Sequence, residues 1–237
     1  MNRYASVAGL VALVWRLVLT TGTGAIFGFL VAREAYDSAI MSPLFIAMSF
    51  SFGLAIFILV LIAACRGSSI EVGDTMARRL GRLLGTFVVV VMYLTAVQHL
   101  ANLYAAEHTG VEHFILLDGG IYTGLFWIGQ VVIGGILPLL LVFGPTTATN
   151  PGRRVALASM LVIVGGFAQV YVLVIGGQAW PLNLFPGMEI SSSFFDGSIA
   201  AYTPSLAEIS LGLGGVAISG LLVMFGMRVL RFLPESP

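Results

Sequence analysis

Charged residues are scarce in this 237-residue sequence, which contains no lysine and only 9% charged residues in total. A soluble domain carries about a quarter charged residues, so this composition could not cover a water-facing surface. Hydrophobic residues make up 58% of the chain. The composition therefore indicates a protein whose solvent is the lipid bilayer.

Cysteine and histidine are also rare. A single cysteine, Cys65, excludes an internal disulfide and any iron–sulfur ligand set built from several cysteines. A membrane b-type haem needs two axial histidines at matching depth, and of the three histidines only His99 lies well inside an apolar run. No Walker loop or dinucleotide-binding fingerprint is present. We therefore expect no haem, iron–sulfur cluster or nucleotide site in this chain and, without a basic stripe, no nucleic-acid partner.

Six apolar segments are long enough to cross a bilayer, which takes about 20 residues of helix. They are apolar throughout and do not alternate, which favours helices over barrel strands. The sequence thus predicts an all-α, polytopic membrane helix bundle with one transmembrane domain over residues 1–237. The predicted spans are residues 8–32, 43–65, 84–104, 122–143, 155–176 and 206–230.

The arginines predict the orientation of the bundle. Nine of them fall on one side of the predicted spans, Arg33 falls on the other side, and Arg16 lies within the first span. Because loops rich in positive charge stay in the cytoplasm, both termini should be cytoplasmic. We expect a multi-pass protein of the cell inner membrane. The nine are Arg3, Arg66, Arg78, Arg79, Arg82, Arg153, Arg154, Arg228 and Arg231.

The segment 177–205 differs from the short loops elsewhere. It contains three prolines and several aromatic residues but no basic residue. Its aromatic content argues against disorder and suits a membrane interface. We interpret it as an ordered cap folded back over the helix ends, and a mobile outer loop is the alternative.

Polar side chains within the spans are costly, so each needs a reason. Gln130 and Gln169 could simply join helices through hydrogen bonds. Arg16 could extend its guanidinium to the headgroups. Glu208 follows Ser205, a potential N-cap, and could favour the start of the last helix through the helix dipole.

The third span carries the densest polar group. Gln98, His99 and Asn102 share one helix face with Thr95. An imidazole can donate a hydrogen bond to a quinone carbonyl or take a proton from a hydroquinone, and an amide can donate to the second carbonyl. A proton relay or a solute path would also fit, and periodicity does not choose between them.

Three further residues, His108, Glu112 and His113, could suggest a metal site just beyond this span. No fourth ligand is indicated, so a solvated rim is the favoured interpretation and no metal site is expected.

Four stretches carry a resemblance to a known family. They are Ser42–Leu61, His99–Gly110, Gly124–Phe143 and Gly165–Gly215, the last with the elements Gly177-Gln178-x-x-Pro181 and Tyr202-x-Pro204-Ser205-x-x-Glu208. From about Gly22 onward the chain resembles the C-terminal part of the NrfD/PsrC-like, polysulfide reductase-type membrane subunits. The run FPGMEISSSFFDG is most similar to DsrP-type members, which are linked to sulfur metabolism.

The resemblance implies a membrane subunit of a respiratory-type oxidoreductase complex, non-catalytic alone. Such a subunit exchanges electrons and protons with menaquinone or ubiquinone and passes electrons to or from a ferredoxin-like iron–sulfur subunit. The complex is then completed by a catalytic redox subunit. The family has more helices than the six that fit here. A divergent short member, a late start codon or a second chain that completes the bundle would each explain this.

For the function, a proton-coupled transporter or channel and an inert membrane anchor remain the alternatives. The quinone hypothesis assigns three roles to residues of this chain. His99 and Glu208 are the candidate catalytic residues. The candidate quinone-binding residues are Gln98, His99, Asn102, Tyr104 and Gln130. The candidate proton route comprises Arg16, Gln169, Gln178, Tyr202 and Glu208.

Overall fold

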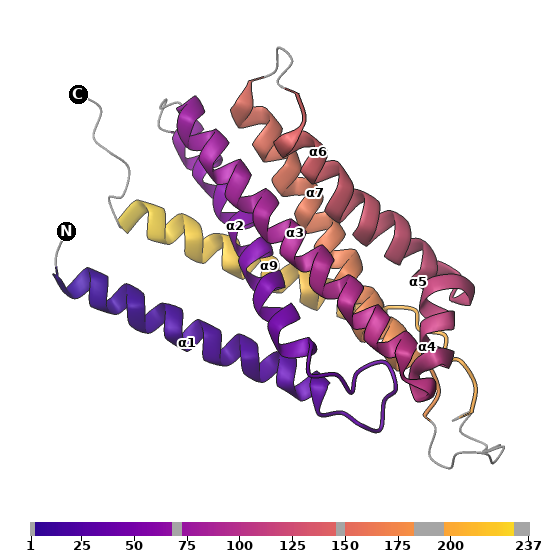
Figure 1. Ribbon diagram of the computed structural model, residues 1–237. Coiled ribbons are helices and arrows are strands. Elements are labelled where there is room, and N and C mark those ends of the chain that lie inside the picture. The colour runs from indigo at the N-terminus through magenta and orange to yellow at the C-terminus, as the bar shows by residue number, and fades with distance from the viewer. Residues whose placement is uncertain (1–2, 68–72, 146–149, 183–196, 230–237) are drawn as a thin grey trace, which may run out of the picture.

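The computed structural model describes residues 3–67, 73–145, 150–182 and 197–229 (Figure 1). These residues are helical with no strand, and six helices are long and apolar enough to cross a membrane, which confirms the all-α polytopic fold. The chain is a multi-pass membrane protein. The six helices are Tyr4–Gly28, Met41–Gly67, Asp74–Tyr104, Ile121–Phe143, Pro151–Ala179 and Leu206–Gly226.

The third span begins at Asp74, earlier than the predicted residue 84. The arginine-rich residues before the apolar run continue the same helix, because arginine is a good helix former. The helix α3 (Asp74–Tyr104) therefore extends past the apolar run and carries Arg78, Arg79 and Arg82 on its first turns.

The centre of the bundle is formed by four long helical segments. They are α2 (Met41–Gly67), α3, α7 (Pro151–Tyr171) and the continuous rod of α5 (Ile121–Gly124), η3 (Leu125–Ile136) and α6 (Leu137–Phe143). The helix α1 (Arg3–Gly28) packs against α2. The helix α9 (Leu206–Val229) passes behind α2 and α3 in the view of Figure 1. Among the described residues, almost none in the most apolar stretches of α1 and α9 is buried within the chain.

Glycines set the closest helix approach, between α7 and η3. A Cβ atom on Gly165 would lie 2.1 Å from the Cα atom of Gly134, and one on Gly129 would lie 2.6 Å from the Cβ atom of Ala168. Small residues at a membrane helix crossing let the backbones approach closely. This crossing places the next residues along each helix, Gln130 and Gln169, in the interior of the bundle.

Three π-helical segments interrupt the α-helical rods: η2 (Phe114–Asp118), η3 and η4 (Val172–Gly176). π-helical turns are rare and occur mostly at functional sites. All three segments lie beside the same interior cavity, described below, so the irregular backbone is concentrated where polar side chains must be aimed inward.

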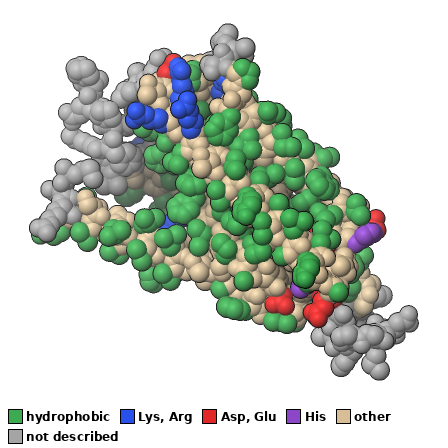
Figure 2. All heavy atoms as spheres, viewed as in Figure 1, with side chains coloured by type: hydrophobic (Ala, Val, Ile, Leu, Met, Phe, Trp, Pro, Cys, Tyr) green, Lys and Arg blue, Asp and Glu red, His purple; other side chains and the backbone are tan. Residues whose placement is uncertain are grey.

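Charge divides between the two ends of the bundle. In Figure 2, arginines gather at the end where α3 begins, whereas carboxylates and a histidine lie at the opposite end. The short elements η1 (Ala106–His108), α4 (Thr109–His113) and α8 (Gly177–Ala179) are at the carboxylate end (Figure 1). Of the predicted cap 177–205, residues 183–196 lie outside the described residues.

Candidate functional site

The most polar contact in the interior of the bundle joins α3 to α4. The Nδ1 atom of His99 lies 2.6 Å from Oε2 of Glu112, and Nδ2 of Asn102 donates to Oε1 of Glu112 at 2.8 Å. The Glu112 side chain is 1% exposed and that of His99 is 16% exposed. Because the chain turns back through η1 and α4 after Tyr104, both carboxylate oxygens have a partner.

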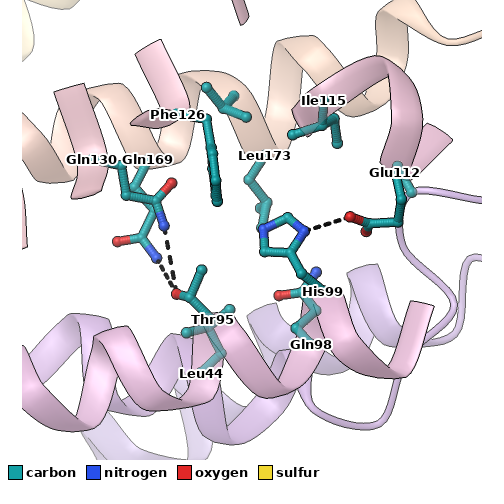
Figure 3. A pocket seen from close by; sticks show the side chains of 12 residues that line it. Leu44, Thr95, Gln98, His99, Glu112, Ile115, Phe126, Gln130, Gln169 and Leu173 are labelled. Carbon is teal, nitrogen blue, oxygen red and sulfur yellow. Dashed lines mark hydrogen bonds and ion pairs between the residues drawn. The ribbon is translucent and has the colours of Figure 1, made fainter. Parts of the chain in front are cut away.

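His99 is held from a second side by Phe126 of η3. The two rings meet edge to face, with centroids 4.8 Å apart and planes at 76°. With Nδ1 bonded to Glu112, the other ring nitrogen points away from the carboxylate in Figure 3. A carboxylate on Nδ1 fixes the tautomer of a neutral imidazole and leaves Nε2 as an acceptor. The Nε2 side of the His99 ring is therefore directed toward the interior of the bundle.

A second polar group lies one turn deeper in the bundle. The Oγ1 atom of Thr95 accepts hydrogen bonds from Nε2 of Gln169 at 3.2 Å and from Nε2 of Gln130 at 3.5 Å. All three side chains are buried and come from three different helices. The glycine crossing of α7 and η3 brings the two amides close enough to share this hydroxyl.

A cavity of about 30 Å³ lies between the two polar groups (Figure 3). This space suffices for one or two water molecules, because a site for one water needs roughly 10–15 Å³ of such volume. A smaller cavity of about 20 Å³ adjoins it and shares Gln130 and Gln169. The first is lined by Ala35, Leu44, Thr95, Gln98, His99, Glu112, Ile115, Phe126, Gln130, Gln169, Val172 and Leu173.

The loop between α1 and α2 closes the carboxylate end of this site. Arg33 donates from Nη1 to the carbonyl oxygens of Gln178 at 2.9 Å and Trp180 at 3.0 Å. Nε1 of Trp180 donates to Oε2 of Glu34 at 3.0 Å, and the His108 ring bonds the Glu34 carbonyl. These bonds tie the loop to α8 and η1.

Tyr36 adds a further bond between this loop and the fifth span. Its hydroxyl donates to the carbonyl oxygen of Val174 at 3.0 Å. Burial raises the pKa of the Tyr36 phenol, an effect that the Arg33 guanidinium partly opposes. The phenol therefore stays neutral and remains a donor.

The structure brings most of the predicted quinone-binding residues together. Gln98, His99 and Gln130 line the cavity, and Asn102 holds the carboxylate that orients His99. Tyr104 is not among them, because it is the last residue of α3 and its side chain is 94% exposed.

The residues of the predicted proton route are dispersed. Gln169 lines the cavity, whereas Arg16 lies at the middle of α1 with Nε 3.4 Å from Oγ of Ser49. Gln178 is exposed at the end of α8. Tyr202 and Glu208 are exposed on the segment before α9 and on its first turn. Among the described residues, none of these four lines the cavity beside His99.

Glu208 caps its own helix. Its Oε2 atom accepts from the backbone nitrogen of Ser205 at 2.7 Å and from the Ser205 hydroxyl at 2.9 Å, and the Ser205 hydroxyl accepts from the Glu208 backbone nitrogen at 3.3 Å. This is the reciprocal capping box of a helix N-terminus. It confirms the N-cap expected at Ser205.

Sequence reasoning missed the role of Glu112. The solvated-rim interpretation is wrong for Glu112 and His108, which are buried, and holds for His113, whose exposed Nδ1 lies 3.1 Å from Asp118. Within the described ranges, no three histidine, cysteine or acidic side chains are grouped closely enough to hold a metal ion. The signal that could have identified it is a carboxylate that follows an interior histidine after a short stretch in which the chain can reverse direction.

Comparison with known proteins gives the family. The family described as "Polysulphide reductase, NrfD" matches residues 1–181, about three quarters of the chain. The chain belongs to the NrfD family. The matched region of this NrfD-family protein contains α1 to α8 and every residue that lines the cavity. No solved structure matches the chain significantly.

Two relatives show what NrfD-family proteins are named for. The chain is 31% identical to an "Hdr-like menaquinol oxidoreductase integral membrane subunit" of Archaeoglobus fulgidus, over 96% of this chain and 58% of the relative. It is 25% identical to a selenate reductase subunit of Mesobacillus selenatarsenatis, over 96% of this chain and 51% of the relative. The chain thus spans about half the length of these relatives.

Proposed function

We propose that this NrfD-family chain is the quinone-reactive membrane subunit of an oxidoreductase complex. The observation that carries the proposal is the buried His99–Glu112 contact beside a cavity in the middle of an apolar bundle. The names of the relatives support the same reaction, because one is a menaquinol oxidoreductase subunit.

Oxidation of a hydroquinone releases two electrons and two protons, so the site needs a base. His99 is suited to take the first proton at Nε2, because Glu112 stabilises the imidazolium that forms. Gln98 and Gln130 line the same cavity and can donate to a ring oxygen. Reduction of a quinone would use the same groups in reverse.

A quinone ring is larger than the present cavity, so binding requires movement. Phe126 and Leu173 line the cavity as apolar side chains and can change rotamer without leaving a polar group unpaired. Both residues lie in π-helical segments, which occur mostly at functional sites. In the closed arrangement the cavity has room for water, which can carry protons away from His99.

An apolar groove of about 490 Å³ offers a place for the isoprenoid tail. It runs between η3 and α7, on the outer side of the helices that carry Gln130 and Gln169. Apolar clefts of 300–1,000 Å³ are typical of ligand sites. The groove is lined by Ile121, Gly124, Leu125, Ile128, Gly129, Ile133, Val164, Phe167, Ala168 and Tyr171.

The electrons must leave to another protein of the complex, because none of the chemistry above stores them in this chain. A ferredoxin-like iron–sulfur subunit is the proposed acceptor or donor, and the complex is completed by a catalytic redox subunit. The family match and the names of the relatives support such partners. A role in sulfur metabolism is the narrower proposal.

The test is substitution of His99 by leucine in the assembled complex. We expect His99→Leu to abolish quinol-dependent electron transfer while the complex still assembles. His113→Leu is the matched control, because His113 is an exposed histidine on α4, the helix that carries Glu112. This control variant should leave the rate unchanged. Full quinol-dependent activity in His99→Leu would reject the proposal and favour an inert anchor, and ion flux through the purified chain alone would favour a transporter.

A further inference from the structure

A second polar cavity lies at the opposite end of the bundle from His99. It has a volume of about 120 Å³ and is bordered by α3, α6 and α7. We call it the arginine pocket. Its lining residues are Arg78, Gly81, Arg82, Leu141, Val142, Pro151, Arg154 and Val155.

The sequence assembles this pocket through helix spacing and one glycine. Arg78 and Arg82 are four residues apart on α3 and so lie on one face. Gly81 lies between them, and a Cβ atom there would be 2.8 Å from Cγ2 of Val155. Because Gly81 has no side chain, α7 packs closely against α3, and Arg154 of α7 lines the same pocket as the two arginines of α3.

Among the described residues, the pocket has more positive charge than neighbouring carboxylates balance. Asp74 lies 3.6 Å from Arg78, and both side chains are more than half exposed. Arg154 donates to the carbonyl oxygens of Gly144 at 3.2 Å and Pro145 at 3.3 Å, which fixes a guanidinium that has five N–H donors. The Arg82 side chain makes no hydrogen bond or ion pair within the described residues. In the part of the chain that the structure describes, three cations therefore line the pocket and one carboxylate, Asp74, pairs with one of them.

Like charges four residues apart destabilise a helix, so an anion in the pocket would relieve a cost already present in the fold. Guanidinium groups bind phosphate oxygens through two parallel hydrogen bonds. A volume of about 120 Å³ is well above the roughly 10–15 Å³ of such volume that one water needs. The pocket thus has both the charge and the room for a phosphate group.

The apolar residues of the pocket identify the source of that phosphate. Leu141, Val142 and Val155 continue from the arginines into the membrane-spanning part of α6 and α7. A soluble phosphate ion would gain nothing from them, whereas the glycerol and upper acyl carbons of a lipid would pack there. We propose that the arginine pocket binds the headgroup phosphate of an anionic phospholipid, as basic pockets between transmembrane helices do.

The test is lipid retention by the purified full-length chain, with any subunits that remain attached. Native mass spectrometry would count bound phosphatidylglycerol and phosphatidylcholine after equimolar addition. Arg82→Gln/Arg154→Gln removes two pocket cations. The matched control is Arg79→Gln/Arg153→Gln. It removes two exposed arginines that are sequence neighbours of the pocket residues Arg78 and Arg154 but do not line the pocket.

We expect the pocket pair to lose phosphatidylglycerol by about tenfold or more, because it removes two cations that can form charge-assisted hydrogen bonds to the phosphate. The control pair should keep the preference of the unsubstituted chain. Arg82→Gln alone breaks no bond within the described residues, so it reports on the lipid even if loss of Arg154 disturbs the fold, and it should also weaken retention.

Three results would overturn the proposal. Equal loss in the two double variants would show general surface electrostatics in place of a site. Displacement of phosphatidylglycerol by millimolar inorganic phosphate alone would identify the free ion as the ligand. Unchanged lipid retention with loss of an acidic partner protein from the pocket variant would identify a protein interface.

Discussion

His99 and Glu112 meet at 2.6 Å although they belong to different helices, because the chain reverses direction between them through η1 and α4. The reversal places a carboxylate behind an interior imidazole. Neither residue alone would define a proton-transfer site: an isolated histidine has no fixed tautomer, and an isolated buried carboxylate would lack a partner. Their contact gives each buried polar group a partner and orients the imidazole that we propose as the base.

The first prediction concerns Glu112→Gln. A glutamine of the same size can present its amide N–H to Nδ1 of His99, which would favour the tautomer with the proton on Nε2. His99 could then no longer accept a proton on the cavity side. Because positioned acid–base groups contribute about 10²–10⁴-fold, we expect quinol oxidation to fall by about 100-fold or more. The measurement is the rate of quinol-dependent electron transfer in membranes.

The control for that prediction is Glu107→Gln, which removes an exposed carboxylate five residues earlier. It should retain the full rate. A Glu112→Gln variant that assembles and works as fast as Glu107→Gln would show that the carboxylate serves packing alone.

The membrane spans could be predicted from composition. An apolar run of about 20 residues forms a helix in lipid, because a helix satisfies all of its backbone hydrogen bonds within the segment. The buried face of α3 was predictable for the same kind of reason. Thr95, Gln98 and Asn102 recur at helical spacing in an apolar segment, and all three are buried. Local pattern and local structure agree in these cases.

The partners of that face were not predictable from pattern. Glu112 lies in a short polar stretch that reads as a surface turn, and its inward direction depends on how η1 and α4 fold back. The π-helical segments have no known sequence signal comparable to a heptad or a cap. For Glu208 the sequence left two interpretations open, a functional carboxylate and a residue that favours the helix start, and the structure places it in the helix cap.

The second prediction concerns the shared acceptor Thr95. Thr95→Val keeps the shape of the side chain but removes the oxygen that accepts from Gln130 and Gln169. Two buried amides would lose a partner, so we expect a loss of about 1–3 kcal/mol in the free energy of unfolding. A titration with a denaturing detergent measures it. Thr86→Val, on the exposed face of the same helix, should cost less, and equal losses would contradict the shared-acceptor role.

The third prediction concerns the crossing of α7 and η3. Gly165→Ala introduces a Cβ atom 2.1 Å from the Cα atom of Gly134, so the helices must separate. Overpacking of this kind costs about 1–3 kcal/mol or more, and we expect a lower melting temperature in detergent. Gly22→Ala is the control, because nothing lies within 4 Å of a Cβ atom there. It should be neutral or stabilising, since alanine favours a helix over glycine.

The fourth prediction concerns Ser159 on α7, whose side chain is fully buried. Its hydroxyl is buried and has no hydrogen-bond partner among the described residues. Leaving such a group unpaired costs about 1–3 kcal/mol, so Ser159→Ala should keep or raise the melting temperature. A lower melting temperature for Ser159→Ala would contradict this expectation, because it would show that the hydroxyl has a hydrogen-bond partner such as a buried water.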